Sequence, residues 1–98
     1  MLFMLTTRNK DSWYALAPEK QGEILGAFQQ YLERWSKEGK VKALYMLGNM
    51  KGAVMIYDLG SSEEMARAAF EASPFPFVDA ELTPLVEWDV VVKALAKK

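Results

Sequence analysis

A lysine and a glutamate near the start of a predicted helix are the first candidates for chemistry. Lys20 precedes Glu23 by three residues, and side chains at this spacing are neighbours on a helix surface. At the mouth of a cleft between a sheet and its helices, loss of hydration would suit the two groups to proton transfer. The alternative is a solvated ion pair that stabilises the helix only weakly. We take Lys20 and Glu23 as the candidate catalytic residues.

Aromatic side chains form the second candidate set. They can line an apolar pocket in which a phenol hydroxyl or an indole N–H donates a hydrogen bond to a bound ligand. The same side chains can instead fill the core or an interface between subunits, and we assign Trp88 to packing or to a subunit contact. The candidate substrate-binding residues are Trp13, Tyr14, Tyr31 and Tyr45.

The chain contains neither cysteine nor histidine. The composition therefore excludes disulfides, thiolate catalysis and the commonest metal ligands, and leaves Asp, Glu, Lys, Tyr or bound water for proton transfer. Asp79 and Glu81 alternate with apolar residues and would make a weak oxygen site for a metal, so we expect them at solvent or in interface ion pairs. We expect no metal site and no cofactor.

Length and charge narrow the class of protein. Ninety-eight residues suit a single domain, residues 1–98. A net charge of −1 and a pI near 5.4 argue against binding to nucleic acid or to an anionic membrane. The apolar start, Met1–Leu5, is too short for a signal peptide or a membrane span, so we expect a cytoplasmic protein.

The first half of the chain predicts a strand followed by a long helix. Residues 1–7 are mostly apolar and end at a polar cluster, which is typical of a buried strand. Pro18 can open a helix, and Gly39 can end it. Apolar residues at helical spacing lie between the two, and predict a helix over residues 18–38: Ile24, Leu25, Phe28, Tyr31, Leu32 and Trp35.

The second half predicts a hairpin, a short helix and a last strand. Residues 41–47 and 53–59 are apolar runs joined by a glycine-flanked loop. Ser61 and Glu64 form a capping box, which predicts a helix to about residue 72. Apolar residues then occupy every even position from 78 to 92, and this period of two predicts a strand over that span.

The resulting order, β-α-β-β-α-β, predicts an α+β protein of ferredoxin-like topology. Its four-stranded antiparallel sheet would carry two helices on one face. The other face would be bare, so we expect a second copy of the chain to cover it. Pro84 cannot donate a hydrogen bond to a neighbouring strand and belongs on an edge or at a bulge. An RNA-binding sheet is disfavoured, because Ala53 and Met55 occupy the positions where such domains carry stacking aromatics.

Residues Phe75–Leu85, with the sequence FPFVDAELTPL, resemble the C-terminal signature of the muconolactone Δ-isomerase family. The long first helix ending at Gly39, Tyr45 after it, and Ile56–Asp58 extend the resemblance over almost the whole chain. It implies a dimeric α+β barrel that assembles into rings, commonly decamers. It also implies cofactor-free isomerisation of a lactone in the bacterial breakdown of catechols.

The residues that carry the family's acid/base chemistry are replaced here. Met4 and Ala43 stand where family members carry strand histidines, Glu23 stands at the family's lysine, and Ala27 or Phe28 stands at its carboxylates. Two functions follow from this. One is cofactor-free proton transfer on a small unsaturated lactone or a related ring compound. The alternative is a non-catalytic oligomeric binding or structural protein, or a cofactor-free cyclase or oxygenase, on the same barrel. Either would have a small-molecule ligand and a second copy of itself as partners.

Overall fold

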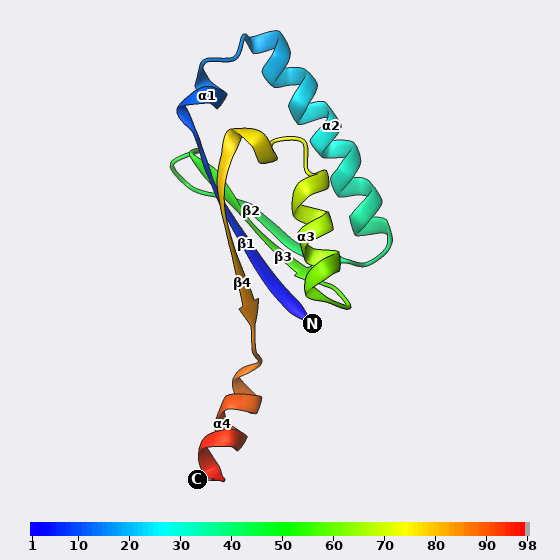
Figure 1. Cartoon of the computed structure of the whole chain (residues 1–98), viewed down its shortest axis with the longest axis vertical. Coiled ribbons are helices and arrows are strands. Elements are labelled where there is room, and N and C mark those ends of the chain that lie inside the picture. Colours follow the sequence, from blue (N-terminus) through cyan, green and yellow to red (C-terminus); the bar gives the residue numbers. More distant parts are fainter. Residues whose placement is uncertain (98) are drawn as a thin grey trace.

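The computed structural model describes residues 1–97 and shows a four-stranded sheet with helices on one of its faces (Figure 1). The strand order is β2-β3-β1-β4, and every neighbouring pair is antiparallel. This confirms the predicted α+β, ferredoxin-like fold. The strands are β1 (Leu2–Asn9), β2 (Val41–Met46), β3 (Gly52–Asp58) and β4 (Val78–Leu85).

Alternation along β1 divides the sheet into a covered and an uncovered face. Phe3, Leu5 and Thr7 are buried, whereas the residues between them are only half-buried. The buried set packs against α2 (Pro18–Lys37) and α3 (Ser62–Glu71), which lie on the same side of the sheet (Figure 1). The core therefore lies between this face and the two helices, as the sequence predicted.

The helix α2 begins and ends at the predicted signals. Pro18 occupies the first turn, where its missing N–H costs no hydrogen bond. Gly39 adopts a left-handed φ of 73° just after the helix. Its N–H donates to the carbonyl of Ser36, and the N–H of Lys40 donates to that of Trp35. These two bonds form a Schellman cap, which satisfies the last carbonyls and turns the chain toward β2.

The hairpin and α3 also lie where they were expected. The backbone N–H of Glu64 donates to Ser61 Oγ at 3.1 Å, and the Glu64 carboxylate accepts from the N–H of Gly60 at 3.4 Å. The cap therefore forms, although the carboxylate reaches residue 60 instead of 61. Gly52 begins β3 where a Cβ atom would lie 1.9 Å from the carbonyl oxygen of Thr7. Only glycine permits this close approach of β1 and β3.

The prediction of one strand through residue 92 is wrong. The strand β4 ends at Leu85, and α4 (Trp88–Ala96) follows it. Leu85 pairs with Leu2, the first residue of β1, so a longer β4 would have no neighbour to satisfy its backbone groups. A helix satisfies them within the segment. Trp88 consequently lies on α4, not on a strand face, and α4 runs past the predicted end of the strand to Ala96.

Three other features of the chain bear on the sequence predictions. The edge position of β4 confirms the placement of Pro84 on an edge. The strand β1 continues two residues past its predicted end, to Asn9. Two short elements were not predicted: the helix α1 (Asp11–Tyr14) and the 3-10 turn η1 (Phe75–Phe77).

Two buried tyrosines connect the sheet to both helices. Tyr31 of α2 donates its hydroxyl proton to the carbonyl of Ala68 in α3 at 2.6 Å. Tyr57 of β3 can then donate to the Tyr31 oxygen, 2.8 Å away. Burial raises the pKa of Tyr31 far above its usual value, and the neighbouring Tyr57 adds to this effect. Burial also raises the pKa of Tyr57.

These raised pKa values predict an alkaline loss of stability. Below about pH 10, tyrosine is neutral in both the folded and unfolded states, so the buried pair makes its full contribution to the free energy of unfolding. Above it, the unfolded chain ionises first, and each buried tyrosine lowers the free energy of unfolding by about 1.4 kcal/mol per pH unit. Tyr31→Phe should cost about 1–3 kcal/mol at pH 7 and reduce the steepness of this alkaline loss. Urea unfolding between pH 7 and 11 measures both effects.

The matched control for this experiment is Tyr45→Phe, because Tyr45 is 66% exposed. It should leave both the stability at pH 7 and the alkaline slope unchanged. Equal slopes for the wild type and Tyr31→Phe would contradict the assignment of the alkaline loss to the buried pair.

Candidate functional site

Side-chain size falls from one end of the covered sheet face to the other. Paired residues of β1 and β3 run from Phe3–Tyr57 through Leu5–Met55 to Thr7–Ala53, and Thr7 also pairs with Ala80 of β4. The aromatic end fills the space beneath the helices with buried side chains. At the other end, the small side chains leave that space open.

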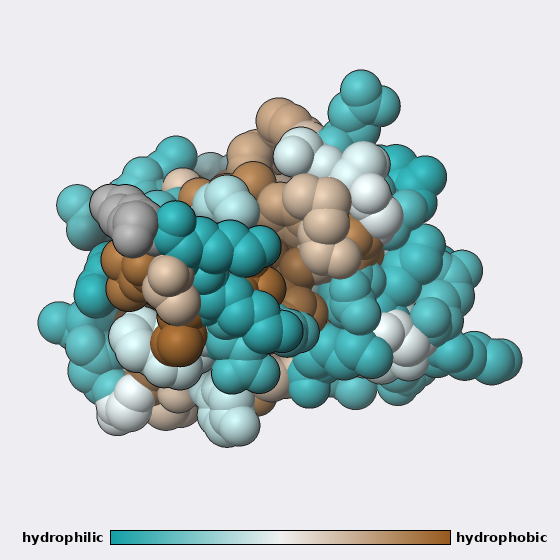
Figure 2. Space-filling model, turned by 90° about the horizontal axis from the view of Figure 1, so that it is seen from below, coloured by the Kyte–Doolittle hydropathy of each residue, from teal (hydrophilic) through white to brown (hydrophobic). Residues whose placement is uncertain are grey.

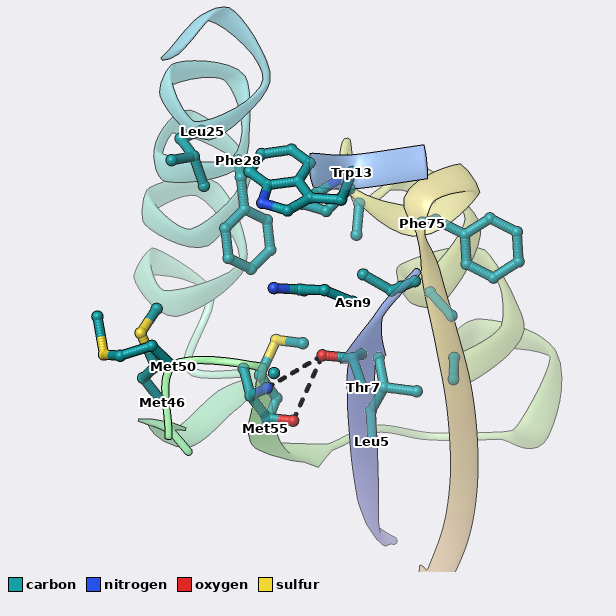
Figure 3. A pocket seen from close by; sticks show the side chains of 17 residues that line it. Leu5, Thr7, Asn9, Trp13, Leu25, Phe28, Met46, Met50, Met55 and Phe75 are labelled. Carbon is teal, nitrogen blue, oxygen red and sulfur yellow. Dashed lines mark hydrogen bonds between the residues drawn. The ribbon is translucent and has the colours of Figure 1, made fainter. Parts of the chain in front are cut away.

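A cavity of about 210 Å³ lies at this open end, bordered by all four strands and by α1, α2 and α3 (Figure 3). Its lining is mostly apolar. Leu25 and Phe28 come from α2, and Met46 and Met50 come from the hairpin. None of the described lining residues has an ionisable side chain.

Asn9 is the polar group best placed to meet a ligand. It is the last residue of β1, and its amide end points into the space bounded by Trp13, Phe28 and Met50 (Figure 3). Its Nδ2 donates to the hydroxyl of Tyr14 at 3.3 Å. A side-chain amide has two N–H donors and an acceptor oxygen. Asn9 therefore keeps one donor and its oxygen for a ligand carbonyl or hydroxyl.

Thr7 is the other lining residue with a side-chain oxygen, but its hydroxyl already forms hydrogen bonds within the protein. Its Oγ1 accepts from the N–H of Ala53 at 3.2 Å and donates to the Ala53 carbonyl at 3.4 Å (Figure 3). Both bonds hold β1 to β3 beneath the pocket. Thr7 therefore supports the floor of the pocket, and Asn9 provides its polar contact.

Trp13 closes one side of the pocket and is held in place by its surroundings. The short helix α1 follows Lys10, whose N–H donates to the carbonyl of Phe77 at 2.9 Å. Gln21 donates its side-chain amide to the carbonyl of Trp13 at 2.9 Å. The indole packs at a tilt against the ring of Phe77, with the centroids 6.3 Å apart. The first turns of α2 thus position the pocket wall through Gln21.

Met50 is a strained residue at the hairpin end of the pocket. Its φ of 65° is in the left-handed region, which costs energy for a residue with a side chain. The neighbouring Asn49 accepts a hydrogen bond from the N–H of Lys51 at 3.0 Å, which stabilises the turn. This turn brings the Met50 side chain into the pocket lining.

The structure places the predicted catalytic pair away from this lining. Lys20 and Glu23 form an ion pair at 3.6 Å, with side chains that are 58% and 71% exposed. Neither residue borders the pocket. Their catalytic role stays a prediction, and what the structure shows is the solvated ion pair that the sequence left as the alternative.

The predicted aromatic residues are distributed over three regions. Trp13 lines the pocket, and Tyr14 reaches it through Asn9. Tyr31 lies in the core. Tyr45 lies on the uncovered face of the sheet, since it pairs with Val54, whose neighbours Ala53 and Met55 face the pocket.

Asn9 itself was missed by the sequence reasoning. It stands in a polar cluster that predicts only the end of a strand. The available signal was its separation by two from Thr7, which puts both residues on the covered face once β1 is extended.

Two other kinds of site are absent from residues 1–97, the part of the chain that the structure describes. No three residues among Asp and Glu lie close enough together to hold a metal ion. No helix there is long and apolar enough to cross a membrane. Chemically, the pocket can enclose an apolar ligand and make a hydrogen bond to it through Asn9.

Two solved structures share the fold of this chain. No protein-family model and no curated protein sequence matches the chain. Among solved structures, muconolactone isomerase is similar with a TM-score of 0.77 and 21% identity, over 89% of this chain and 90% of that one. Also similar is the 5-chloro-2-hydroxyhydroquinone dehydrochlorinase of Burkholderia phenoliruptrix AC1100, in complex with 2,5-dihydroxybenzoquinone. Its TM-score is 0.71 and its identity 14%, over 92% of this chain and 98% of that one.

The resemblance read from the signature at residues 75–85 is thus confirmed at the level of the fold. The chain has the α+β fold of muconolactone isomerase.

Proposed function

We propose that the protein binds a small ring compound with an oxygen substituent in the pocket beside Asn9. The observation that carries this proposal is the apolar cavity of about 210 Å³ with a single available amide. An apolar cavity of about 150 Å³ is large enough to hold benzene, whereas pockets for drug-sized ligands span about 300–1,000 Å³. The size therefore suits a single substituted ring.

The fold likeness supports the same class of ligand. One similar structure contains 2,5-dihydroxybenzoquinone, a single ring that carries oxygen substituents. The other is of an enzyme named for a lactone. A protein that binds such a compound without transforming it is the first candidate, because the described lining holds no acid or base.

Asn9→Ala should weaken binding of an oxygenated ring specifically. We expect p-cresol to bind about tenfold more weakly to this variant, since a buried hydrogen bond is lost. Toluene, which has the same ring and methyl group without the hydroxyl, should bind the variant and the wild type alike. Protein-observed NMR titration measures both affinities, with Tyr45→Phe as the control variant. Failure of both compounds to saturate the pocket would overturn the proposal.

Proton transfer on the bound ring is the second candidate, favoured by the hydrogen bond between Tyr14 and Asn9. The Tyr14 hydroxyl lies 3.3 Å from Asn9 Nδ2, at the exposed edge of the pocket. A phenol in this position can give or take a proton at the ligand's edge. Isomerisation of an unsaturated lactone in this pocket would need such a group.

Deuterium uptake tests the second candidate. The neutral unsaturated lactone β-angelica lactone, in deuterated buffer, should exchange ring hydrogens faster with the protein than without it. Tyr14→Phe should slow this exchange by about 100-fold or more, the usual contribution of a general acid or base, while binding persists. Proton NMR follows the exchange. Equal rates with and without protein would leave binding alone as the function.

Self-association is the third part of the proposal. The helix α4 projects from the body of the chain (Figure 1), and it has no buried residue. Trp88 is 74% exposed, and Val86, Val90 and Leu95 are exposed as well. Viewed from this end, apolar side chains come to the surface among polar ones (Figure 2). Such a surface favours burial against another copy of the chain. The cellular location of the protein is a separate matter, and a cytoplasmic location stays a prediction.

A size measurement tests self-association. Sedimentation of the wild type should give a mass above the 11.1 kDa of one chain. Trp88→Glu should shift the distribution toward that mass, because it places a charge in the apolar surface of α4. Lys93→Gln, on the same helix, serves as the control, because it makes the same change of −1 in net charge without altering the apolar surface. A clean monomer in the wild type would contradict this part of the proposal.

A further inference from the structure

Given the binding function proposed above, we propose that this pocket takes neutral ring compounds and rejects those that carry a carboxylate. The first reason is the composition of the lining, in which no described residue is a lysine or an arginine. A ligand carboxylate turned toward this apolar lining would lose hydration without gaining a cation. Burial of an unpaired ion is costly, much more so than burial of a neutral polar group.

The cations nearest to the lining in sequence do not supply this charge. Arg8 lies between Thr7 and Asn9, and alternation along β1 directs it to the opposite face of the sheet. Lys10 and Lys51 flank lining residues, but both are exposed and neither borders the cavity.

The backbone around the pocket also disfavours an anion. Helix N-termini bind anions through their free N–H groups, whereas the C-terminal end carries partial negative charge. The lining residues of α2 begin at Leu25, past its first turn. Those near α3 are Ala69 and Ala72, which lie at its C-terminal end. The helix end that faces this cavity is therefore the negative one.

Glu71 lies in the last turn of α3, and two arginines balance its charge. Arg34 and Arg67 pair with its carboxylate at 3.4 Å and 3.9 Å on the exposed surface. These arginines are thus engaged outside the pocket, and neither borders its lining.

An isosteric pair of ligands tests charge selectivity directly. 4-Hydroxybenzamide and 4-hydroxybenzoate have the same ring and nearly the same shape, and differ in charge at pH 7.5. We expect the benzoate to bind at least about 100-fold more weakly, given the cost of an unpaired buried ion. Its apparent affinity should rise as the pH falls toward the pKa of its carboxyl group, because the neutral form then becomes available. The benzamide should show no such rise.

A substitution that adds a cation should reduce the selectivity. Leu25 lines the cavity and is half-exposed, so Leu25→Lys can place its ammonium group at the pocket mouth while its stem remains against the apolar wall. We expect this variant to bind the benzoate about two- to fivefold more tightly than the wild type does, as an ion pair at a half-exposed position would. Ala27→Lys adds the same charge at an exposed position of α2 outside the lining. This variant should bind the benzoate no more tightly than the wild type does.

The outcomes separate this inference from the function on which it rests. Binding of the benzamide alone supports both. Equal binding of the two compounds to the wild type overturns charge selectivity but leaves ring binding intact. Binding of neither compound overturns ring binding, and charge selectivity with it.

Discussion

The register between β1 and β3 is the constraint on which the rest of the structure depends. It aligns large residues with large ones at one end of the covered face, Phe3 with Tyr57, and small with small at the other, Thr7 with Ala53. A slip by one residue would turn the buried side chains of β1 to the uncovered face. Two local features oppose that slip. Gly52 permits close contact with the Thr7 backbone, and the Thr7 hydroxyl bonds both backbone groups of Ala53.

The two ends of the layer between sheet and helices therefore differ: one is filled by buried side chains, and the other holds the pocket. At the filled end, the hydroxyls of Tyr31 and Tyr57 hold α2, β3 and α3 together while satisfying each other's hydrogen bonds. Burial of polar groups is tolerable there because they are paired. These bonds hold both helices against the sheet at the filled end. At the other end, smaller side chains lie beneath the helices, and a cavity is present there instead of a filled core.

Most of the fold could be predicted from the sequence because its signals are local. Pro18 and Gly39 bound α2, and the Ser61–Glu64 box begins α3, whatever the rest of the chain does. The end of β4 could not be found in this way. Alternation continues past Leu85, but strand length is set by the neighbour, and the pairing of β4 with β1 ends at Leu85 and Leu2. Period two is a necessary condition for a strand, not a sufficient one.

The pocket was harder to predict than the fold because it depends on what several elements leave out. Trp13 is one of the predicted aromatic residues and lies in the lining, but nothing local marks Asn9 as the amide that would face it. The sequence predicted a charged catalytic pair, yet Lys20 and Glu23 form an ion pair with each other at the exposed surface.

A scaffold shared with enzymes does not decide whether a given site is catalytic, since function depends on the groups in the site. In this chain the described lining offers shape, an apolar surface and one amide. Those features select a ligand by its size, its neutrality and the position of one oxygen atom. Any chemistry on that ligand would have to enter from the edge of the pocket, where Tyr14 meets Asn9.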